Sequence, residues 1–304
     1  MAVTVYQNSK SQILHGQASA LYAAGRFQAV IEKYDRILAA DATDIHAWIH
    51  RGYALCELQD YEAALESFQR ALQLEPNDAL AWHGCGIAQA RQADYAAAFT
   101  SFDRTFILNP DDLKALYNRG NALIRLNRHQ QALENFNMLI QKQPENYRAW
   151  YNRALVLAAL RRYHDALSSL DTTVSIKPNC HYAWTYRGLI LNRLYRFRDA
   201  MASFDRSLRH RTPNPNALYG KASTYALQGN VPQAVQLLRK AIVVGSNLYR
   251  VIAQTDPSFS KLINRPEIQT LLQFPSGNGE RQQDSLKYQE CSALNHGPNS
   301  ALEF

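Results

Sequence analysis

Residues that could carry out catalysis or bind a metal are scattered along this 304-residue chain. The one Gly-Lys pair, Gly220-Lys221, is followed by Ala and lacks the upstream glycine of a phosphate-binding loop. Neither an H-E-x-x-H nor a G-x-S-x-G motif occurs. His46 and His83 come closest to a histidine cluster, and no carboxylate or third ligand recurs with them. We therefore predict a protein that is not an enzyme and has no catalytic residue, cofactor or metal site.

The four cysteines, Cys56, Cys85, Cys180 and Cys291, are far apart and form no C-x-x-C pair. This spacing is typical of reduced thiols in a cytosolic protein. The first residues lack the charged-then-apolar order of a signal peptide, and no apolar run approaches the ~18 residues of a membrane helix. These features predict a cytoplasmic protein without a membrane-inserted segment.

Acidic and basic residues recur together at a fixed spacing. A cation follows an aspartate by sixteen residues in the pairs Asp35/Arg51, Asp103/Arg119, Asp171/Arg187 and Asp205/Lys221. Where Cys85 replaces the cation, Gln69 replaces the aspartate. Each cation lies in a stripe that should be apolar, and burying an unpaired charge is costly. We therefore predict structural ion pairs within these four sets.

The elements that carry these pairs repeat every 34 residues. Trp48, Trp82, Trp150 and Trp184 are 34, 68 and 34 residues apart. Leu116 occupies the position halfway between Trp82 and Trp150, where the period would place another tryptophan. Prolines keep the same period at Pro76, Pro110, Pro144 and Pro178. Alanines keep it at Ala64, Ala98, Ala132, Ala166 and Ala200, and a large apolar residue follows four positions after each of them. Gly52, Gly86, Gly120 and Gly188 recur in the same way, with Ala154 as the exception. The pattern predicts that the large residue packs against the small one, while proline ends the helix.

This spacing resembles the tetratricopeptide repeat (TPR) family, whose pattern is W-x2-L-G-x2-Y, then A-x3-F, then P. The resemblance implies an all-α, right-handed α-solenoid of about seven helix-turn-helix repeats. After an N-terminal arm (1–10), we place the repeats at 11–44, 45–78, 79–112, 113–146, 147–180, 181–214 and 215–248. Residues 249–274 are expected to form capping helices, and the polar tail 275–304 to be disordered. The phrase YNRGNAL looks like bacterial, particularly cyanobacterial, TPR proteins.

In the TPR family, one face of the first helix of each repeat lines a concave groove. On this resemblance, the candidate peptide-binding residues are His83, Lys114, Tyr117, Asn118, Asn121, Arg125, Arg148, Tyr151, Asn152, Tyr182, Asn192 and Arg193. Amides bond both polar groups of a peptide backbone, and cations meet acidic side chains. Packing between helices is the alternative role for the asparagines and tyrosines. A chaperone-type carboxylate clamp is disfavoured, because tyrosines (Tyr117, Tyr182, Tyr186) stand at its cationic positions.

Charge is divided unevenly along the chain. Residues 11–112 carry 7 Lys/Arg against 14 Asp/Glu, whereas residues 113–248 carry 20 against 6. We predict a protein–protein interaction scaffold or adaptor that binds an extended acidic peptide, in complex assembly or regulation, with no small-molecule substrate. The alternatives are RNA binding through the basic half and salt-dependent head-to-tail self-association.

Overall fold

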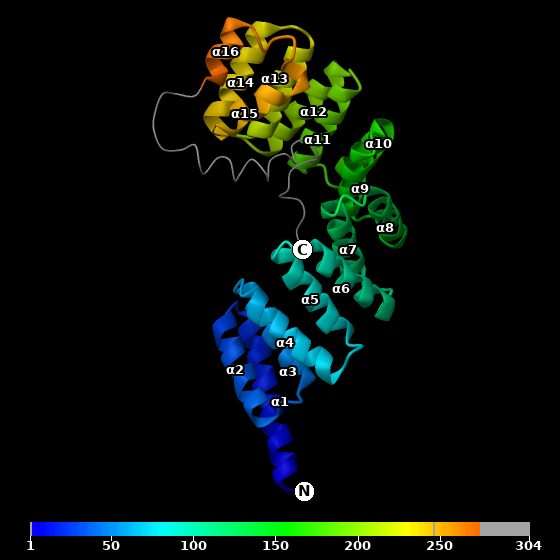
Figure 1. Cartoon of the computed structure of the whole chain (residues 1–304), viewed down its shortest axis with the longest axis vertical. Helices are drawn as coiled ribbons and strands as arrows, with labels where there is room; N and C mark the ends of the chain where they lie inside the picture. Colours follow the sequence, from blue (N-terminus) through cyan, green and yellow to red (C-terminus); the bar gives the residue numbers. More distant parts are fainter. Residues whose placement is uncertain (1, 246, 274–304) are drawn as a thin grey trace. The chain divides into compact units, whose positions relative to one another are not determined.

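The computed structural model describes residues 2–245 and 247–273, with side chains from residue 11 onward. Over these residues the chain forms sixteen α-helices and one 3-10 helix, without strands (Figure 1). Consecutive helices pack against each other in pairs, as in a TPR-type α-solenoid. The all-helical fold predicted from the 34-residue period is therefore confirmed. The predicted tail, 275–304, lies outside the described residues.

The chain divides into two compact units, of which the first ends at Asn135. Unit 1 contains α1 (Ala2–Ala23), α2 (Phe27–Ala40), α3 (Ile45–Glu57), α4 (Tyr61–Leu74), α5 (Ala79–Arg91), α6 (Tyr95–Leu108), α7 (Leu113–Arg125) and the first half of α8 (His129–Lys142). Helix α1 begins at Ala2, so the predicted N-terminal arm is continuous with the first repeat helix.

Unit 2 begins at Phe136, within α8. Its repeats are built from α9 (Tyr147–Ala159), α10 (Tyr163–Ile176), α11 (His181–Arg193), α12 (Phe197–His210), α13 (Pro215–Leu227) and α14 (Val231–Gly245). The predicted cap consists of α15 (Leu248–Thr255), η1 (Pro257–Phe259) and α16 (Pro266–Leu272). Tyr249, Phe259 and Ile268 of the cap are buried in one cluster with α13 and α14. The cap thus covers the last apolar face of the repeats.

The helix boundaries follow from local chemistry. Asp44, Asp78 and Asp112 each cap the first helix of a repeat by accepting a hydrogen bond from a backbone N–H three residues on. The turn between the two helices of each repeat has one residue with positive φ, and these are Gly25, Gln59, Ala93, Asn127, Arg161, Tyr195 and Gly229. A left-handed residue ends a helix by letting the chain bond back onto the last carbonyls.

Small residues meet large ones in the core, as the spacing predicts. A Cβ on Gly52 would lie 2.6 Å from the Phe68 ring, and one on Gly188 would lie 2.5 Å from the Phe204 ring. Each ring also faces a glycine of the following repeat, which the period did not single out. Gly84 would place a Cβ 2.3 Å from Phe68. Glycines on both sides of the ring therefore let adjacent repeats close on it.

All four predicted cation–aspartate pairs are formed. The N···O distances are 2.7 Å for Arg51–Asp35 and 2.6 Å for Arg119–Asp103, Arg187–Asp171 and Lys221–Asp205. The three arginines also donate forward to a residue sixteen positions downstream, namely Ser67, Asn135 and Ser203, at 2.7, 2.8 and 2.7 Å. Each arginine thus links the second helices of two successive repeats, and the sequence analysis had found only the first of these partners.

Candidate functional site

The structure separates the twelve candidate groove residues by burial. His83, Asn118, Asn121, Tyr151, Asn152 and Asn192 are buried, whereas Tyr117, Arg125 and Tyr182 are half-buried and Lys114, Arg148 and Arg193 are exposed. A buried side chain must find its partners inside the repeats. The exposed and half-buried members are therefore the ones that a peptide could reach.

In unit 1, His83 on α5 joins neighbouring repeats. Its Nδ1 lies 3.3 Å from the Tyr53 hydroxyl, and its Nε2 lies 3.4 Å from the Asn118 amide nitrogen. Burial lowers the pKa of His83. A buried imidazole between two polar partners is a packing group, a role that the sequence suggested for the asparagines and tyrosines of this set but not for His83.

Arg125 of unit 1 is also engaged within its own unit. Its guanidinium donates to the Tyr95 hydroxyl at 2.5 Å and lies 4.6 Å above the centre of the Tyr95 ring. Such a cation–π contact holds the side chain against α6. Arg125 therefore holds its positive charge in a fixed position at the C-terminal end of α7.

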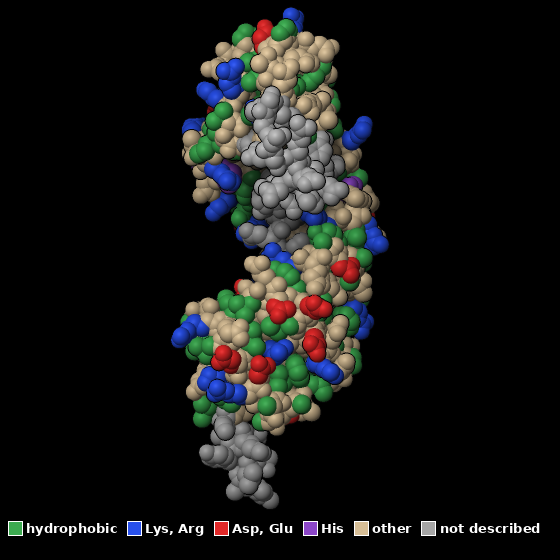
Figure 2. Space-filling model, turned by 60° about the vertical axis from the view of Figure 1, so that its left-hand side comes forward, with side chains coloured by type: hydrophobic (Ala, Val, Ile, Leu, Met, Phe, Trp, Pro, Cys, Tyr) green, Lys and Arg blue, Asp and Glu red, His purple; other side chains and the backbone are tan. Residues whose placement is uncertain are grey.

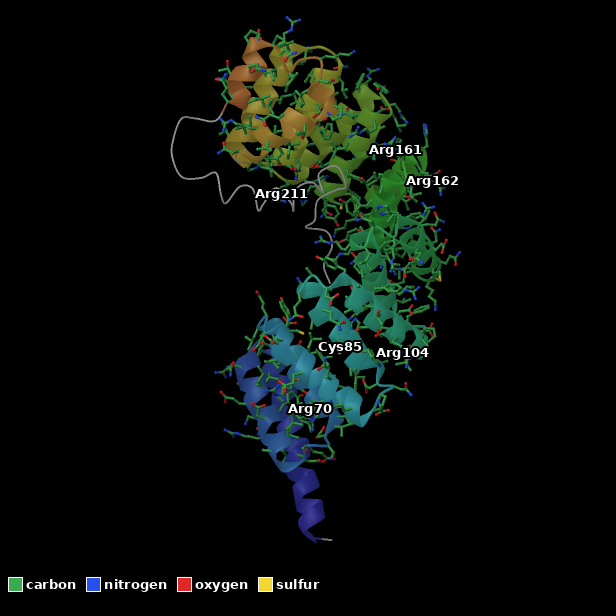
Figure 3. The ribbon with its side chains drawn as sticks, in the orientation of Figure 1. Arg70, Cys85, Arg104, Arg161, Arg162 and Arg211 are labelled. Atoms are coloured by element: carbon green, nitrogen blue, oxygen red, sulfur yellow. The ribbon has the colours of Figure 1, made fainter. Side chains whose placement is uncertain are left out.

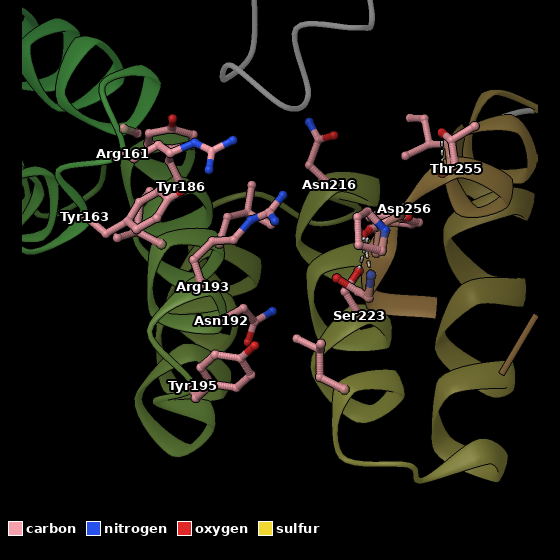
Figure 4. A pocket seen from close by; sticks show the side chains of 18 residues that line it. Arg161, Tyr163, Tyr186, Asn192, Arg193, Tyr195, Asn216, Ser223, Thr255 and Asp256 are labelled. Atoms are coloured by element: carbon pink, nitrogen blue, oxygen red, sulfur yellow. Dashed lines mark hydrogen bonds between the residues drawn. The ribbon is translucent and has the colours of Figure 1, made fainter. Parts of the chain in front are cut away.

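Unit 2 contains a cavity of about 490 Å³ between the repeats and the cap (Figure 4). Its polar lining consists of Arg161, Tyr163, Tyr186, Asn192, Arg193, Tyr195, Asn216, Tyr219, Ser223, Thr255, Asp256 and Ser258. The size is in the range of ligand pockets, which are concave and carry a few placed polar groups. Two candidate residues, Asn192 and Arg193, therefore lie in one cavity.

Two arginines set the charge of this cavity. Arg161 and Arg193 lie on its α9–α11 side, and Asp256 lies on the facing side (Figure 4). Among the residues described here, neither Arg161 nor Arg193 has an ion-pair partner within salt-bridge distance. Arg162, next to Arg161 in Figure 3, instead pairs with Asp165 at 2.7 Å. The positive charges of Arg161 and Arg193 are thus available for a ligand in the cavity.

The one carboxylate in the lining is already occupied. Asp256 accepts hydrogen bonds from the Tyr219 hydroxyl at 2.7 Å, from Ser223 at 3.4 Å and from the Ser258 backbone N–H at 2.8 Å. Burial and the Asp256 charge raise the pKa of Tyr219 well above its usual value. These neutral donors fix the cap to α13 and leave the Asp256 charge in place, so the lining carries two arginine charges against one carboxylate charge.

Asn192 and Asn216 have different roles in the lining. The Asn192 amide donates to the Gly220 carbonyl at 3.3 Å and accepts from the Thr224 hydroxyl at 3.0 Å, so it joins α11 to α13. Asn216 accepts from the Tyr249 hydroxyl at 2.7 Å. That bond uses the Asn216 oxygen and leaves the NH₂ group as a donor at the cavity.

The contribution of the cap to this cavity is not predictable from the repeat pattern. Thr255, Asp256 and Ser258 lie in the segment expected only to close the repeats, and Asn216 is not among the candidate groove residues. An Asp-Pro-Ser run after the last repeat is the available signal, because aspartate before a proline often caps a following turn. The inward position of these residues depends on how the cap folds back on α13.

The cysteines of the described part, Cys56, Cys85 and Cys180, are free, and Cys56 and Cys85 pack with the apolar core of unit 1. Cys85 lies within unit 1 (Figure 3) and is 3% exposed. Burial raises the pKa of Cys56 and Cys85 to about 12. These thiols stay protonated near neutral pH and are poor nucleophiles. Cys291 lies outside the described residues.

The surface of unit 1 differs in charge from the cavity of unit 2. Acidic side chains gather on the face of unit 1 seen in Figure 2, in agreement with the excess of Asp and Glu in residues 11–112.

None of the described helices is long and apolar enough to cross a bilayer.

Comparison with known families agrees with this architecture. A family model described as TPR repeat matches residues 52–92, and one described as tetratricopeptide repeat matches residues 85–146, 117–179, 151–209 and 193–247. These matches cover more than half of the chain, so the chain belongs to the tetratricopeptide repeat family. None of the curated proteins matches it.

Solved structures of TPR proteins share the fold. The crystal structure of YrrB, described as a TPR protein with an unusual peptide-binding site, is 19% identical with a TM-score of 0.55, and the match covers 62% of this chain and 97% of YrrB. A TPR protein from Parabacteroides merdae is 16% identical with a TM-score of 0.62, over 79% and 94% of the two chains. PilF from Pseudomonas aeruginosa is 15% identical with a TM-score of 0.58, over 71% and 95%. At these identities the likeness concerns the fold alone.

Proposed function

We propose that this TPR protein is a non-enzymatic interaction scaffold, and that the cavity of unit 2 binds an acidic segment of a partner protein. TPR repeats are protein-interaction modules, which supports the general function. The cavity with two arginines that lack an ion-pair partner among the described residues is the observation that supports an acidic ligand. The cytoplasmic location and the role in assembly or regulation stay predictions.

In this proposal, a carboxylate of the ligand lies between Arg161 and Arg193. Guanidinium groups present several N–H donors in a plane, so a carboxylate can accept two parallel hydrogen bonds. Tyr163 and Tyr195, which also line the cavity, supply rigid ring surfaces that bury ligand area at a low entropic cost. The Asn216 NH₂ group can donate to a backbone carbonyl of the ligand.

A charge-reversal experiment tests the proposal. A fluorescein-labelled peptide of alternating Glu and Ala is titrated with the full chain, with a Lys/Ala peptide as the control ligand. The Arg161→Glu/Arg193→Glu double variant should bind the acidic peptide about tenfold or more weakly, ~1.4 kcal/mol, because two attractive charges become repulsive.

A matched double variant separates a local effect from a change in net charge. Arg198 and Arg209 are exposed on α12 and do not line the cavity. Arg198→Glu/Arg209→Glu makes the same change in net charge and should keep most of the affinity. Equal losses in the two double variants would show that the acidic peptide is held by the general positive field, and the cavity would no longer be the proposed site.

RNA binding through the basic half is the competing function. Arg162 and Arg196 of this half pair with Asp165 and Asp199 at 2.7 and 2.6 Å, so part of the turn charge is neutralised within the protein. Gel-shift assays with a single-stranded RNA at several salt concentrations distinguish the two. If RNA bound more tightly than the acidic peptide, with a steep salt dependence, RNA binding would be favoured as the function of the basic half.

A further inference from the structure

Unit 1 brings together two histidines and a carboxylate from separate parts of the sequence. His15 lies on α1, Asp44 caps α3, and His46 is in the first turn of α3. One ligand atom from each of the three lies within 4.8 Å of the other two. The sequence predicts no metal site, because no carboxylate or third ligand recurs with His46 and His83. The packing of α1 near the start of α3 supplies both.

Hydrogen bonds determine which nitrogen of His15 is available. His15 Nε2 lies 2.9 Å from Oδ2 of Asp44, and Oδ1 of Asp44 accepts the Ala47 backbone N–H at 2.9 Å. A carboxylate takes a proton only from a donor, so His15 carries its proton on Nε2 when it is neutral. Its Nδ1 then holds a lone pair. This arrangement of carboxylate, imidazole and free nitrogen is the one that orients histidine ligands in metal sites.

The free nitrogen of His15 faces a second one. His15 Nδ1 and His46 Nδ1 are 3.2 Å apart. For a tetrahedral zinc with Zn–N distances of ~2.0–2.1 Å, the spacing between two nitrogen ligands is about 3.3 Å. We propose that His15 and His46 bind a divalent transition-metal ion of the zinc class through these Nδ1 atoms, with Asp44 orienting His15. On binding, a neutral His46 that carries its proton on Nδ1 releases it to solvent and takes one up on Nε2, so that Nδ1 offers its lone pair while the ring stays neutral.

A third imidazole lies beside this pair. His50 is one helical turn after His46, a spacing that places two histidines on one helix face, and the two ring centres are 4.0 Å apart. Partial burial and the neighbouring His15 imidazole lower the pKa of His46, and the deeper burial of His50 lowers its pKa to about 4. Neutral imidazoles are the form that binds metal. Because the His46 side chain is exposed, an ion can reach the site from solvent.

The competing interpretation is a hydrogen-bonded histidine pair without metal, in which His46 Nδ1–H donates to His15 Nδ1. The two differ in what happens when metal is added. A bound ion would join α1 to α3, and so tie the first repeat, which has Leu14 in the tryptophan position and no periodic proline, to the second.

Metal titration of the full chain, prepared without a histidine tag, tests the proposal. Isothermal calorimetry with Zn²⁺ should show one equivalent of tight binding, and Co²⁺ should give the visible spectrum of nitrogen and oxygen ligands without a thiolate charge-transfer band. His15→Gln and His46→Gln should each remove this equivalent. Asp44→Asn should weaken it about 10–100-fold, as for other residues that orient a ligand, while the asparagine still caps α3.

Control variants keep the test decisive. His164 is exposed on α10, and His164→Gln and His296→Gln should bind like the wild type. Far-UV circular dichroism checks that each variant is folded, and hydrogen exchange should show Zn²⁺ protecting α1 in the wild type and not in His46→Gln. Absence of tight binding, unchanged binding in His15→Gln and His46→Gln, or a thiolate band with Co²⁺ would overturn the proposal.

Discussion

Replacing Arg119 by alanine removes three contacts within unit 1, two with the preceding repeat and one within its own repeat. Its guanidinium pairs with Asp103 at 2.6 Å, donates to the Asn135 side-chain oxygen at 2.8 Å, and lies 4.6 Å from the centre of the Phe106 ring. Asn135 in turn donates to the Leu116 carbonyl at 2.7 Å. We expect the variant to be destabilised mainly through its buried partner, Asn135, rather than through the aspartate that the sequence spacing identified.

The magnitude follows from the exposure of each partner. The Asp103 side chain is 38% exposed, so water replaces the arginine and the loss is about 0.2–1 kcal/mol. Asn135 is fully buried, and an oxygen left there without its donor costs about 1–3 kcal/mol. The ring contact adds ~0.5–1 kcal/mol. Arg119→Ala should therefore lower the free energy of unfolding by about 2–4 kcal/mol.

Double-mutant cycles measure the two couplings separately. Arg119→Ala is combined once with Asp103→Ala and once with Asn135→Ala, and stability is followed by urea unfolding. Because repeat arrays do not always unfold in one step, hydrogen exchange of the α7 amides gives the local value. Arg198→Ala, on an exposed part of α12, is the control and should change stability by less than about 0.5 kcal/mol.

The coupling of Arg119 to Asn135 should exceed its coupling to Asp103. A larger coupling to Asp103 would mean that the ion pair, and not the buried amide, carries the stabilisation, and the argument from burial would be refuted. A loss of stability below about 1 kcal/mol in Arg119→Ala would show that the three contacts together do not stabilise the repeats to the extent expected from burial.

Three further outcomes are expected. Gly188→Ala should lower the free energy of unfolding, measured in urea, by about 1–3 kcal/mol, because its Cβ would lie 2.5 Å from the Phe204 ring. Gly16→Ala should raise it by about 0.5–1 kcal/mol in the same assay, because a Cβ at this helical position would have nothing within 4 Å. Ala93 has a φ of 64°, so Ala93→Gly should raise the melting temperature, and a lower value would contradict a strained turn. The pKa of His50 is lowered to about 4, so protonation favours unfolding, and stability is present above pH ~6.5 and lost as the pH falls toward 4. The melting temperature should therefore fall less on acidification in His50→Gln than in the wild type, and equal falls would show that His50 does not contribute.

Local and periodic features were predictable because the same kinds of contact recur in several repeats. The spacing of Trp150 from Pro144 is one example, since the indole N–H donates to the Pro144 carbonyl at 2.8 Å, and the same contact occurs in the repeats of Trp82 and Trp184. The pairing of Asp171 with Arg187 was predictable for the same reason. A contact that repeats leaves a period in the sequence, and covariation at that period reveals its partners.

The burial of particular polar residues was less predictable. Asn118 and Asn192 stand at positions that face the groove by family resemblance, yet both are buried and bond across to neighbouring helices. The forward partner Asn135 differs in type from Ser67 and Ser203, so the recurrence at this position is a small polar residue rather than one amino acid. Helix periodicity assigns a residue to a face, but the depth of that face depends on how closely the next repeat packs.

The repeat length, the helix pairs, the resemblance to TPR proteins and the inter-repeat ion pairs could be predicted, because each follows from spacing along the chain. Tertiary packing sets which polar residues are accessible, closes the cap over the cavity that contains Arg161 and Arg193, and brings His15 to His46. These contacts join segments that have no common register in the repeat. Their geometry depends on the docking of single, non-repeating elements, the first helix and the C-terminal cap, and no period in the sequence records it.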